Sequence, residues 1–472
     1  MRRGRRPKRA PRAAERRAFR RRKIHPLRAG MGKVKRGGAP MEGGSIGRAI
    51  RRIRLIVLVF AAAGIPAALT ALNVSGGRAA AEIDSKSAHE APSLPALAPE
   101  PSLPALAPDR PPTAGPSPAP VTASDWNGEN FETIRRLRIP YAVRGVYVTG
   151  WTAGGPKMAD ILALIDQGLV NAVVIDVKED RGRITYRTDV PLARTVGADR
   201  ERMIPDLDGL LDALHERNVY VIARLVSFKD PLLATARPEW ALRLKDGGLY
   251  RDAKGVAWID AYQQPVWAYN ADIAVELAEK GVQEIQLDYV RFPENGSVVD
   301  RLVRYANPDG RSKAEGIADY IATVRERLRP YPVFLSADVF GLVTTVADDM
   351  NIGQKWELIS PRVDVISPMM YPSHYAPGSY GVPKPDLAPA AIIAAGLQDA
   401  ARKDAAVRAA GYRPAAIRPW YQAFSASWLG TGNWMPYGPA EVKSQITAGE
   451  AAGIRSYLLW DPANRYEAAY FR

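Results

Sequence analysis

Short apolar runs alternate with longer amphipathic stretches from about residue 125 to the end of the chain. Eight of the runs are rich in β-branched and aromatic residues and predict strands. They span 143–149, 172–177, 220–226, 284–292, 332–340, 363–371, 416–424 and 456–460. Helical spacing of apolar residues occurs between them, at 158–168, 207–217, 272–280, 313–329 and 439–453. This alternation indicates a parallel sheet whose strands are joined by crossover helices.

The repeats predict an α/β fold, a (β/α)8 TIM barrel, for residues 125–472. A TIM barrel typically needs about 250 residues, so this region has room for insertions in its loops. A doubly wound open sheet is the alternative, and it predicts a Gly-x-Gly-x-x-Gly fingerprint after the first strand. Residues 149–155 read TGWTAGG, which does not match that fingerprint.

The sequence before the predicted barrel has a different character in each of its parts. Residues 1–54 form a basic head with almost no apolar residues, and 55–72 are an apolar run followed by alanines at 79–81. Such an order is typical of a secretory signal peptide, and the run is also long enough for a membrane anchor. We therefore expect 55–81 to direct the protein out of the cytoplasm, secreted or anchored in the cell envelope. A start at Met31 or Met41 would leave a signal of ordinary length.

A proline- and alanine-rich linker is predicted for residues 82–124. Residues 91–120 contain 11 prolines, and the octapeptide PSLPALAP occurs at 92–99 and again at 101–108. Such a segment cannot build a core and behaves as an extended, semi-rigid spacer. It would hold the barrel away from a membrane or wall.

Charge is unevenly distributed along the chain. The formal net charge is +15, from 65 Lys and Arg against 50 Asp and Glu. The first 54 residues hold 21 of these basic residues and two of the acidic ones, which leaves 44 basic and 48 acidic residues in the remainder. We therefore expect no nucleic-acid partner for the folded domain. If the head itself binds nucleic acid or anionic lipid, that binding should weaken steeply with salt.

The absence of cysteine removes several classes of chemistry. Disulfides, thiolate zinc sites, iron–sulfur clusters and a cysteine nucleophile are all excluded. Because the chain has only four histidines, we expect no catalytic zinc and no other metal or cofactor.

Polar residues recur where the predicted strands end, which in a TIM barrel is the active-site face. The candidate catalytic residues are Asp288 and Asp338, and the candidate substrate-binding residues are Asp176, Lys178, Arg224, Arg291, Tyr371, His374, Trp420, Gln422, Trp460 and Asp461. Asp176 and Lys178 are two positions apart, which predicts that both side chains lie on one face of their strand. A charge at a strand end can also be solvated or cap a helix, but recurrence on several strands favours a shared polar pocket.

Tryptophan is frequent, with ten in the chain. Four of them lie at or near predicted strand ends or in long connections: Trp258, Trp420, Trp434 and Trp460. They could supply flat apolar surface for sugar rings, or they could simply pack in the core and loops. The connection after the third predicted strand, from 227 to about 270, is long enough to suggest a function.

Four sequence blocks carry a resemblance to a known family: IDVKED at 175–180, LDYVRFP at 287–293, SADVFG at 336–341 and SPMMYPSHY at 367–375. From about residue 141 to the end, the chain resembles a bacterial family of predicted glycoside hydrolases with a TIM barrel. The resemblance implies that fold and a hydrolase acting on glycosidic bonds.

More distantly, the fourth strand resembles that of α-amylase-type barrels. The likeness implies that Asp288 is the nucleophile, and Asp338 occupies the place of the acid/base residue. Two departures separate the chain from those enzymes, because Gln286 stands where they have an arginine and the seventh strand has no His-Asp pair. A second partial likeness, to chitinase-type barrels, places Tyr371 and Trp460 at positions that form the floor beneath the sugar.

Hydrolysis of a glycosidic bond needs one protonated carboxyl group and one ionised carboxylate. Asp288 and Asp338 lie on adjacent predicted strands, so their charges should repel and raise the pKa of one of them. Lys178, Arg224 or Arg291 would then stabilise the negative charge of the other. Alternatively, one of the two carboxyl groups only orients the substrate.

We therefore expect a glycoside hydrolase that cleaves a polysaccharide or a cell-envelope glycan through Asp288 and Asp338. The alternative from another class is a non-catalytic glycan-binding or cell-envelope scaffold that keeps the barrel without the chemistry. The departures at Gln286 and on the seventh strand favour that alternative. A membrane contact would come through residues 55–72.

Overall fold

The computed structural model describes residues 142–472, which is most of the region predicted to form a barrel. The predicted head, signal or anchor segment and linker lie outside the described residues, as do residues 125–141 of the predicted domain. In the part that is described, no helix combines the length and apolar character needed to cross a membrane.

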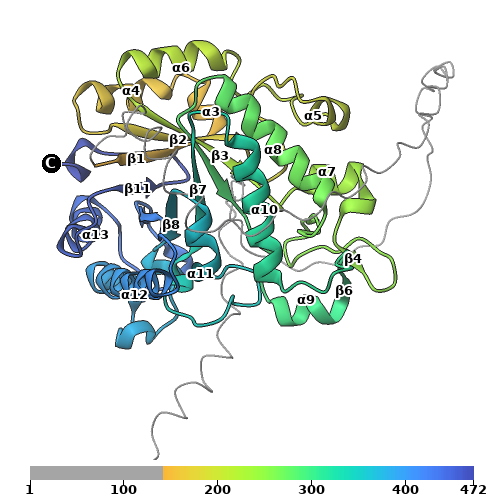
Figure 1. Cartoon of the computed structure of the whole chain (residues 1–472). Helices are drawn as coiled ribbons and strands as arrows, with labels where there is room; N and C mark the ends of the chain where they lie inside the picture. The colour runs from red at the N-terminus through yellow and green to blue at the C-terminus, as the bar shows by residue number, and fades with distance from the viewer. Residues whose placement is uncertain (1–141) are drawn as a thin grey trace, which may run out of the picture. The chain divides into compact units, whose positions relative to one another are not determined.

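Parallel strands close into an eight-stranded barrel (Figure 1). In barrel order they are β1 (Arg144–Val148), β2 (Ala172–Lys178), β3 (Tyr220–Val226), β5 (Glu284–Asp288), β7 (Phe334–Phe340), β8 (Val365–Met369), β10 (Trp420–Gln422) and β11 (Tyr457–Trp460). The ring is complete because β11 pairs with β1 and β10 pairs with β8. The predicted (β/α)8 barrel is confirmed, and the closed ring excludes the doubly wound open sheet.

The seventh strand of the barrel is interrupted. Its first part, β9 (Ala416–Ile417), pairs with β8, and β10 resumes after a gap of two residues. Pro419 lies in the gap and has no N–H group to donate to the neighbouring strand, which explains the break. The single predicted strand at 416–424 is therefore correctly placed but contains two short pieces.

Helices surround the strands, as the (β/α)8 pattern requires (Figure 1). They are α3 (Gly150–Ala153), α4 (Met158–Asp166), α5 (Pro191–Val196), α6 (Leu207–Glu216), α7 (Pro231–Ala236), α8 (Gln264–Glu279), α9 (Gly296–Leu302), α10 (Lys313–Leu328), α11 (Trp356–Ile359), α12 (Pro389–Ala409) and α13 (Pro439–Ala451). The sequence prediction at 272–280 covers only the second half of α8, and the long helix α12 was not predicted. Alanine supplies much of α12, so its apolar periodicity is weak.

Local sequence explains the most regular elements. Every residue of β2 and of β3 is buried, as expected for strands covered by side chains of the barrel interior on one face and by helices on the other. Helix α10 begins with a capping box: the Ser312 hydroxyl accepts the backbone N–H of Glu315, and the Glu315 carboxylate accepts the backbone N–H of Ser312.

Two apolar layers lie on opposite faces of the barrel wall. Inside the barrel, Val174, Ile222 and Leu458 pack with aromatic residues that include Trp420. Outside it, the alternate strand residues, such as Val173, pack against the helices in the main core. The period-two alternation of the strands produces both layers.

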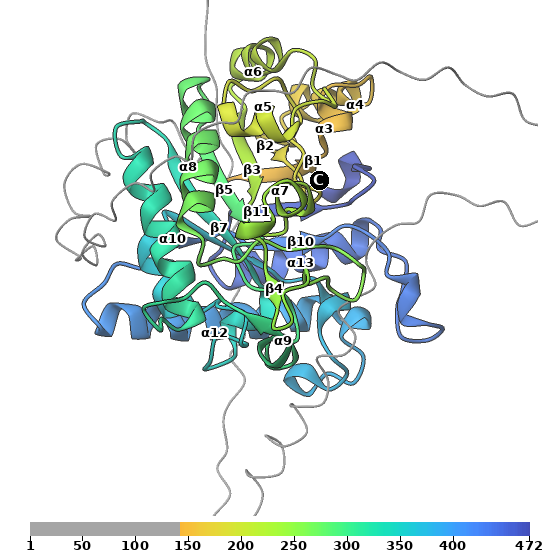
Figure 2. The same cartoon turned by 90° about the vertical axis from the view of Figure 1, so that its right-hand side faces the viewer.

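A small lobe is built from the connections after β3 and β5. The strands β4 (Arg243–Leu244) and β6 (Val303–Arg304) pair antiparallel and join the two connections. Leu242, Trp258 and Val299 form the centre of its own apolar cluster. In Figure 2, β4, α7 and α9 lie in front of the barrel strands. Trp258 is thus a core residue of this lobe, 3% exposed, rather than an open sugar platform.

The expectation that Lys178 shares a face with Asp176 is wrong. A bulge in β2 interrupts the alternation, because Asp176 pairs with Arg224 but Lys178 already pairs with the next residue, Leu225. The Lys178 ammonium forms an ion pair of 2.8 Å with Asp230, and both side chains are fully buried. Lys178 also donates to Asn270 of α8 (3.2 Å). It therefore links the barrel wall to the surrounding helices.

We predict that replacing Lys178 with Met lowers the free energy of unfolding by about 3–5 kcal/mol, because it leaves the Asp230 carboxylate buried without a cation. Chemical denaturation measures this. The control Arg329→Met breaks an ion pair whose side chains are 65% and 62% exposed, and should cost under about 1 kcal/mol. Equal effects of the two substitutions would show that the buried pair has no special role.

Candidate active site

Arg224 joins two carboxylates inside the barrel. Its backbone lies between those of Asp176 on β2 and Gln286 on β5, so the guanidinium reaches both neighbouring strands. Nη1 donates to Asp176 Oδ1 at 2.5 Å, while Nε and Nη2 donate to Asp288 Oδ2 at 2.9 and 2.5 Å. All three side chains are at least nine-tenths buried. Arg224 therefore stabilises negative charge on both carboxylates in a place that excludes most water.

The backbone just after Asp288 helps to orient that carboxylate. Tyr289 has φ of 46°, a left-handed conformation that is unfavourable for a tyrosine. In this conformation its N–H donates to Asp288 Oδ1 at 2.5 Å. Asp288 therefore accepts hydrogen bonds from Arg224 on one carboxylate oxygen and from the Tyr289 N–H on the other. Strained backbone is commonly kept at functional sites, where the rest of the structure compensates for its cost.

Asp338 lies on β7, next to the strand that carries Asp288. Burial raises the pKa of Asp338 well above its usual range, and the negative charge of Asp288 raises it further. The indole N–H of Trp420 donates to Asp338 Oδ1 at 2.8 Å. A protonated Asp338 would accept this bond on its carbonyl oxygen and keep its hydroxyl on Oδ2. The environment therefore favours the protonated form of Asp338, whereas the Asp288 carboxylate lies against the Arg224 guanidinium.

Asp176 belongs to the same cluster but has different partners. The Tyr147 hydroxyl donates to Asp176 Oδ2 at 2.5 Å, and Arg224 donates to its other oxygen. Burial raises the pKa of Asp176, while Arg224 and Tyr147 act in the opposite direction. Trp460 stacks on the Tyr147 ring with centroids 3.8 Å apart. The Trp460 ring also lies 5.3 Å from the Arg224 guanidinium, so the aromatic residue and the charged cluster form one unit.

Tyr371 and His374 lie beside this cluster, at the end of β8 and in the following turn. The charges of Asp338 and Asp288 add to the effect of burial in raising the pKa of Tyr371. Within the described residues, the buried Tyr371 hydroxyl has no hydrogen-bond partner. Burial lowers the pKa of His374 to about 4, with a contribution from Lys254. The imidazole is therefore neutral near pH 7 and suited to hydrogen bonding rather than to ion pairing.

Arg291 is one of the three alternative cations predicted from sequence to stabilise the ionised carboxylate, but its guanidinium contacts other groups. Its guanidinium packs over the rings of Phe340 (4.5 Å) and Trp258 (5.1 Å). It also forms an ion pair of 2.9 Å with Glu294. These contacts connect the lobe to the end of β7. Of the three cations proposed from sequence, Arg224 is the one that contacts Asp288.

Gln422 and Asp461 have partners within the protein. The Gln422 side chain accepts the Ser373 N–H at 3.0 Å and donates to Asp386 Oδ1 (2.9 Å) and to the Phe424 carbonyl (3.0 Å). It therefore holds the ends of two loops together. The Asp461 carboxylate accepts two backbone N–H groups of the turn after β11, both at 3.0 Å. A role of either residue in substrate binding stays a prediction.

A second buried polar cluster lies at the opposite end of the barrel interior. Glu284, the first residue of β5, pairs with Arg418 and accepts the Tyr220 hydroxyl (2.8 Å) and the Ser336 hydroxyl (2.5 Å). These partners satisfy the charge of Glu284 internally. The cluster supports the barrel from below the carboxylate site.

Sequence reasoning missed Tyr147 and Tyr289. Tyr147 was detectable, because alternation along the predicted first strand places it at an inward position near the strand end. The left-handed conformation of Tyr289 has no sequence signal, since such a conformation is usually marked by glycine or asparagine. Within residues 142–472, no group of three or more His, Asp or Glu side chains is arranged to hold a metal ion.

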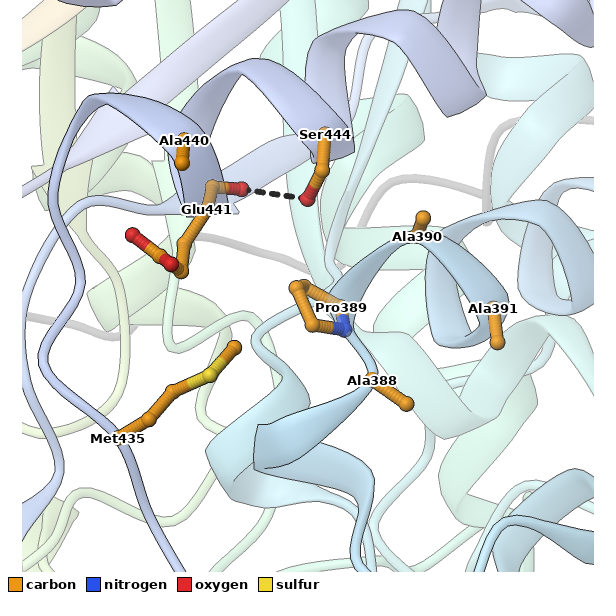
Figure 3. A pocket seen from close by; sticks show the side chains of 8 residues that line it. All are labelled: Ala388, Pro389, Ala390, Ala391, Met435, Ala440, Glu441 and Ser444. Atoms are coloured by element: carbon orange, nitrogen blue, oxygen red, sulfur yellow. Dashed lines mark hydrogen bonds between the residues drawn. The ribbon is translucent and has the colours of Figure 1, made fainter.

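A surface depression of about 390 Å³ lies away from the carboxylate cluster, between the first turns of α12 and α13 (Figure 3). Alanine and proline side chains line most of it, with Met435 at one side. Its single ionisable group, Glu441, accepts the Gly438 N–H at 3.0 Å at the N-terminus of α13. The one ionisable group that lines the depression therefore serves to cap α13.

Residues 145–466 match the sequence profile of the family described as "Putative glycosyl hydrolase domain". The chain belongs to this family. The match includes Tyr147, Asp176, Arg224, Asp288 and Asp338, the whole polar cluster just described. No curated protein matches the sequence.

Solved structures similar to this glycosyl hydrolase domain include a hypothetical protein from Ruminiclostridium thermocellum, with 38% identity and a TM-score of 0.37. The alignment covers 41% of this chain and 97% of that one. The PgaB (BpsB) glycoside hydrolase domain from Bordetella bronchiseptica has 13% identity and a TM-score of 0.49, over 69% of this chain and 97% of that one. The α-galactosidase TtGalA from Thermus thermophilus has 13% identity and a TM-score of 0.41, over 71% and 62% of the two chains.

We predict that Arg224→Met destabilises the glycosyl hydrolase domain more at pH 7 than at pH 4.5. Burial already raises the pKa values of Asp176 and Asp338, and the Arg224 charge opposes both shifts. Without the guanidinium these two pKa values rise further, so the folded state binds more protons than the unfolded chain and loses stability as pH increases. The loss at pH 7 should be about 3–5 kcal/mol, as for breaking a buried ion pair. Denaturation of both proteins at the two pH values measures it. A pH-independent difference would contradict the assigned role of Arg224.

Proposed function

We propose that the domain is a glycosidase that cleaves a polysaccharide or a cell-envelope glycan. Asp338 acts as the general acid, and Asp288 is the ionised carboxylate that attacks the sugar or activates water. The observation that carries the proposal is the unequal environment of the two carboxyl groups. Arg224 contacts Asp288, whereas Asp338 faces the Asp288 charge in a buried place. Family membership supports the same reaction class.

The position of the proton on Asp338 suits the acid role. Trp420 occupies Oδ1 through its N–H, which leaves the hydroxyl on Oδ2 to donate to the leaving oxygen. After donation, the departing alcohol carries the proton and Asp338 becomes a carboxylate. In a retaining reaction it can then take a proton from the water that completes hydrolysis, and in an inverting reaction the water is activated by Asp288.

Arg224 gives Asp288 a fixed charge and a fixed orientation. Its two donors meet the same oxygen, Oδ2, and the Tyr289 N–H meets Oδ1. An oriented carboxylate stabilises the positive charge that develops on the sugar ring in an oxocarbenium-like transition state. Arg224 also compensates, from the neighbouring strand, for the guanidinium that amylase-type barrels place at the position of Gln286.

Aromatic residues around the carboxylates suit a sugar ring. Trp460 is half-buried and stacks on Tyr147, and it forms a T-shaped contact with Trp420, with centroids 5.5 Å apart. A flat ring of this kind can pack against the apolar face of a pyranose. The buried Tyr371 hydroxyl, with no partner in the described structure, can bind a sugar hydroxyl.

A non-catalytic glycan-binding or scaffold function is the second candidate. The observation that favours it is burial, since Asp288 is 5% and Asp338 is 1% exposed. A substrate must therefore displace neighbouring side chains to reach the two carboxyl groups. Binding without turnover in the wild-type protein would support this candidate.

We predict that Asp338→Asn and Asp288→Asn lose hydrolytic activity to different extents on different substrates. The first removes the acid, so hydrolysis of an unactivated glycan should fall by about 10²–10⁴-fold. An aryl glycoside of the same sugar with a dinitrophenolate leaving group should lose much less, because its leaving group needs no proton. Asp288→Asn should lose activity on both the unactivated glycan and the aryl glycoside. Product release is measured by reducing-end assay and absorbance.

The amide oxygen that Asp338→Asn introduces can still accept the Trp420 N–H, so the variant is conservative, and melting temperature serves as the control for folding. If Asp338 is the general acid, kcat/KM of the wild-type enzyme should fall as pH rises through the raised pKa of Asp338. In Asp338→Asn this decline should be absent. Full activity of Asp288→Asn on a glycan that the wild type cleaves would refute the assignment of the central residue.

We also propose that the domain acts outside the cytoplasm. The apolar run at 55–72, the alanines at 79–81 and the proline-rich segment after them support this location. An alkaline phosphatase fusion after residue 124 should be active in a bacterial host. The same fusion without residues 55–81 should be inactive, and equal activity of the two would contradict the proposal.

A further inference from the structure

Phe424 and Trp428 form a stacked aromatic pair just beyond the end of β10. Their ring centroids are 5.8 Å apart and their planes differ by 21°. Trp428 is 43% exposed, so a large part of its apolar ring gains nothing from burial in the fold. The two rings therefore present an aromatic surface that no other described part of the chain covers completely.

This pair is continuous with the carboxylate site. The Phe424 ring meets the Tyr371 ring edge to face at 5.7 Å, and the His374 ring lies 5.3 Å from Tyr371 and 6.3 Å from Phe424. Tyr371 also belongs to the buried cluster inside the barrel that contains Trp420, and the Trp420 N–H donates to Asp338. An uninterrupted row of rings thus leads from the buried carboxylates to the exposed face of Trp428.

The row is held in place before any ligand arrives. Gln422 donates to the Phe424 carbonyl at 3.0 Å and accepts the N–H of Ser373, the residue before His374. Trp428 lies in the short helix η9 (Ser427–Leu429), where the Leu429 N–H donates to the Ala426 carbonyl at 3.1 Å. A prearranged surface loses little conformational freedom on binding.

The chemistry of the row matches a carbohydrate better than an apolar ligand. Aromatic faces suit the C–H faces of pyranose rings, while polar atoms along the row meet hydroxyl groups. The Tyr371 hydroxyl has no partner within the described residues, and the His374 imidazole is neutral near pH 7. The row thus offers both ring faces and hydrogen-bonding atoms, which suit the apolar faces and the hydroxyl groups of a pyranose.

We infer that Phe424 and Trp428 form an outer sugar subsite, which binds a pyranose ring of the glycan at a distance from the bond that is cleaved. The inference rests on the proposed function and extends it. The substrate is a chain of several sugars that runs from the carboxylates past Tyr371 and His374 to Trp428. Short glycosides do not reach this surface.

The test compares Trp428→Ala with Trp428→Phe and with Tyr412→Ala. Tyr412 is also 43% exposed but follows α12 and precedes β9, at the opposite end of the barrel. Binding is first measured by affinity electrophoresis in gels that contain glycol chitin, xylan, carboxymethyl cellulose or soluble starch. Hydrolysis is then measured on oligosaccharides of increasing length from the polysaccharide that binds.

Trp428→Ala should lower kcat/KM about tenfold on the long oligosaccharides, the effect expected for losing one aromatic stacking contact. It should leave the shortest cleaved substrate unchanged and weaken retention in the gel. Trp428→Phe should keep most of the activity on long oligosaccharides and most of the retention in the gel. Tyr412→Ala should behave like the wild type. An equal loss at every length, or no loss at any length, would overturn the subsite.

The outcomes separate this inference from the proposed function. If the wild type cleaves glycans and Trp428→Ala has the same activity on every substrate, the proposed subsite is wrong and the proposed glycosidase function is unaffected. If the wild type binds glycan through Trp428 without cleaving it, the subsite stands and the catalytic proposal fails. A dimer that Trp428→Ala dissociates in size-exclusion chromatography, without an effect on glycan binding, would instead assign the surface to a second copy of the chain.

Discussion

The buried guanidinium of Arg224 is the interaction on which the site depends. Three carboxyl groups lie in the upper part of a barrel interior that also contains Val174, Ile222 and Leu458, and such surroundings disfavour every isolated charge. Arg224 offsets that cost for two of them through three hydrogen bonds. Among the described residues Asp338 forms no ion pair, and burial together with the Asp288 charge outweighs the more distant charges of Arg224 and Arg418 and favours its protonated form. One cation thus produces two carboxyl groups with different properties, which is the asymmetry that glycoside hydrolysis requires.

The barrel makes this arrangement possible because parallel strands present their ends side by side. Asp176, Arg224 and Asp288 come from three consecutive strands, and backbone pairing sets their relative heights. The interior is polar at both ends, with Glu284 and Arg418 forming the lower cluster. The aromatic residues Trp420, Trp460 and Tyr147 fill the space around the upper cluster and exclude water from it.

The fold was largely predictable, because period-two and period-3.6 patterns report directly on strands and helices. Strand β3 has the predicted bounds, and the other strands differ by a few residues at their ends. The errors have local causes. The bulge in β2 moved Lys178 to the other face of the wall, and Pro419 divided the seventh strand. Helix α12 was not predicted because its alanine-rich sequence has little difference in hydrophobicity between its faces.

The sequence alone predicted the order of the strands and the pairing of carboxylates with a basic residue. It also predicted a shared polar site, formed where the strands end, that includes Asp176, Arg224, Asp288, Asp338 and Trp420. Only the tertiary structure decided that Arg224, and neither Lys178 nor Arg291, contacts Asp288. It also decided that Tyr147 completes the cluster and that Trp258 belongs to a separate lobe. Side-chain contacts between distant segments depend on bulges, strand register and loop paths. These result from packing of the whole chain and leave no periodic signal in the sequence.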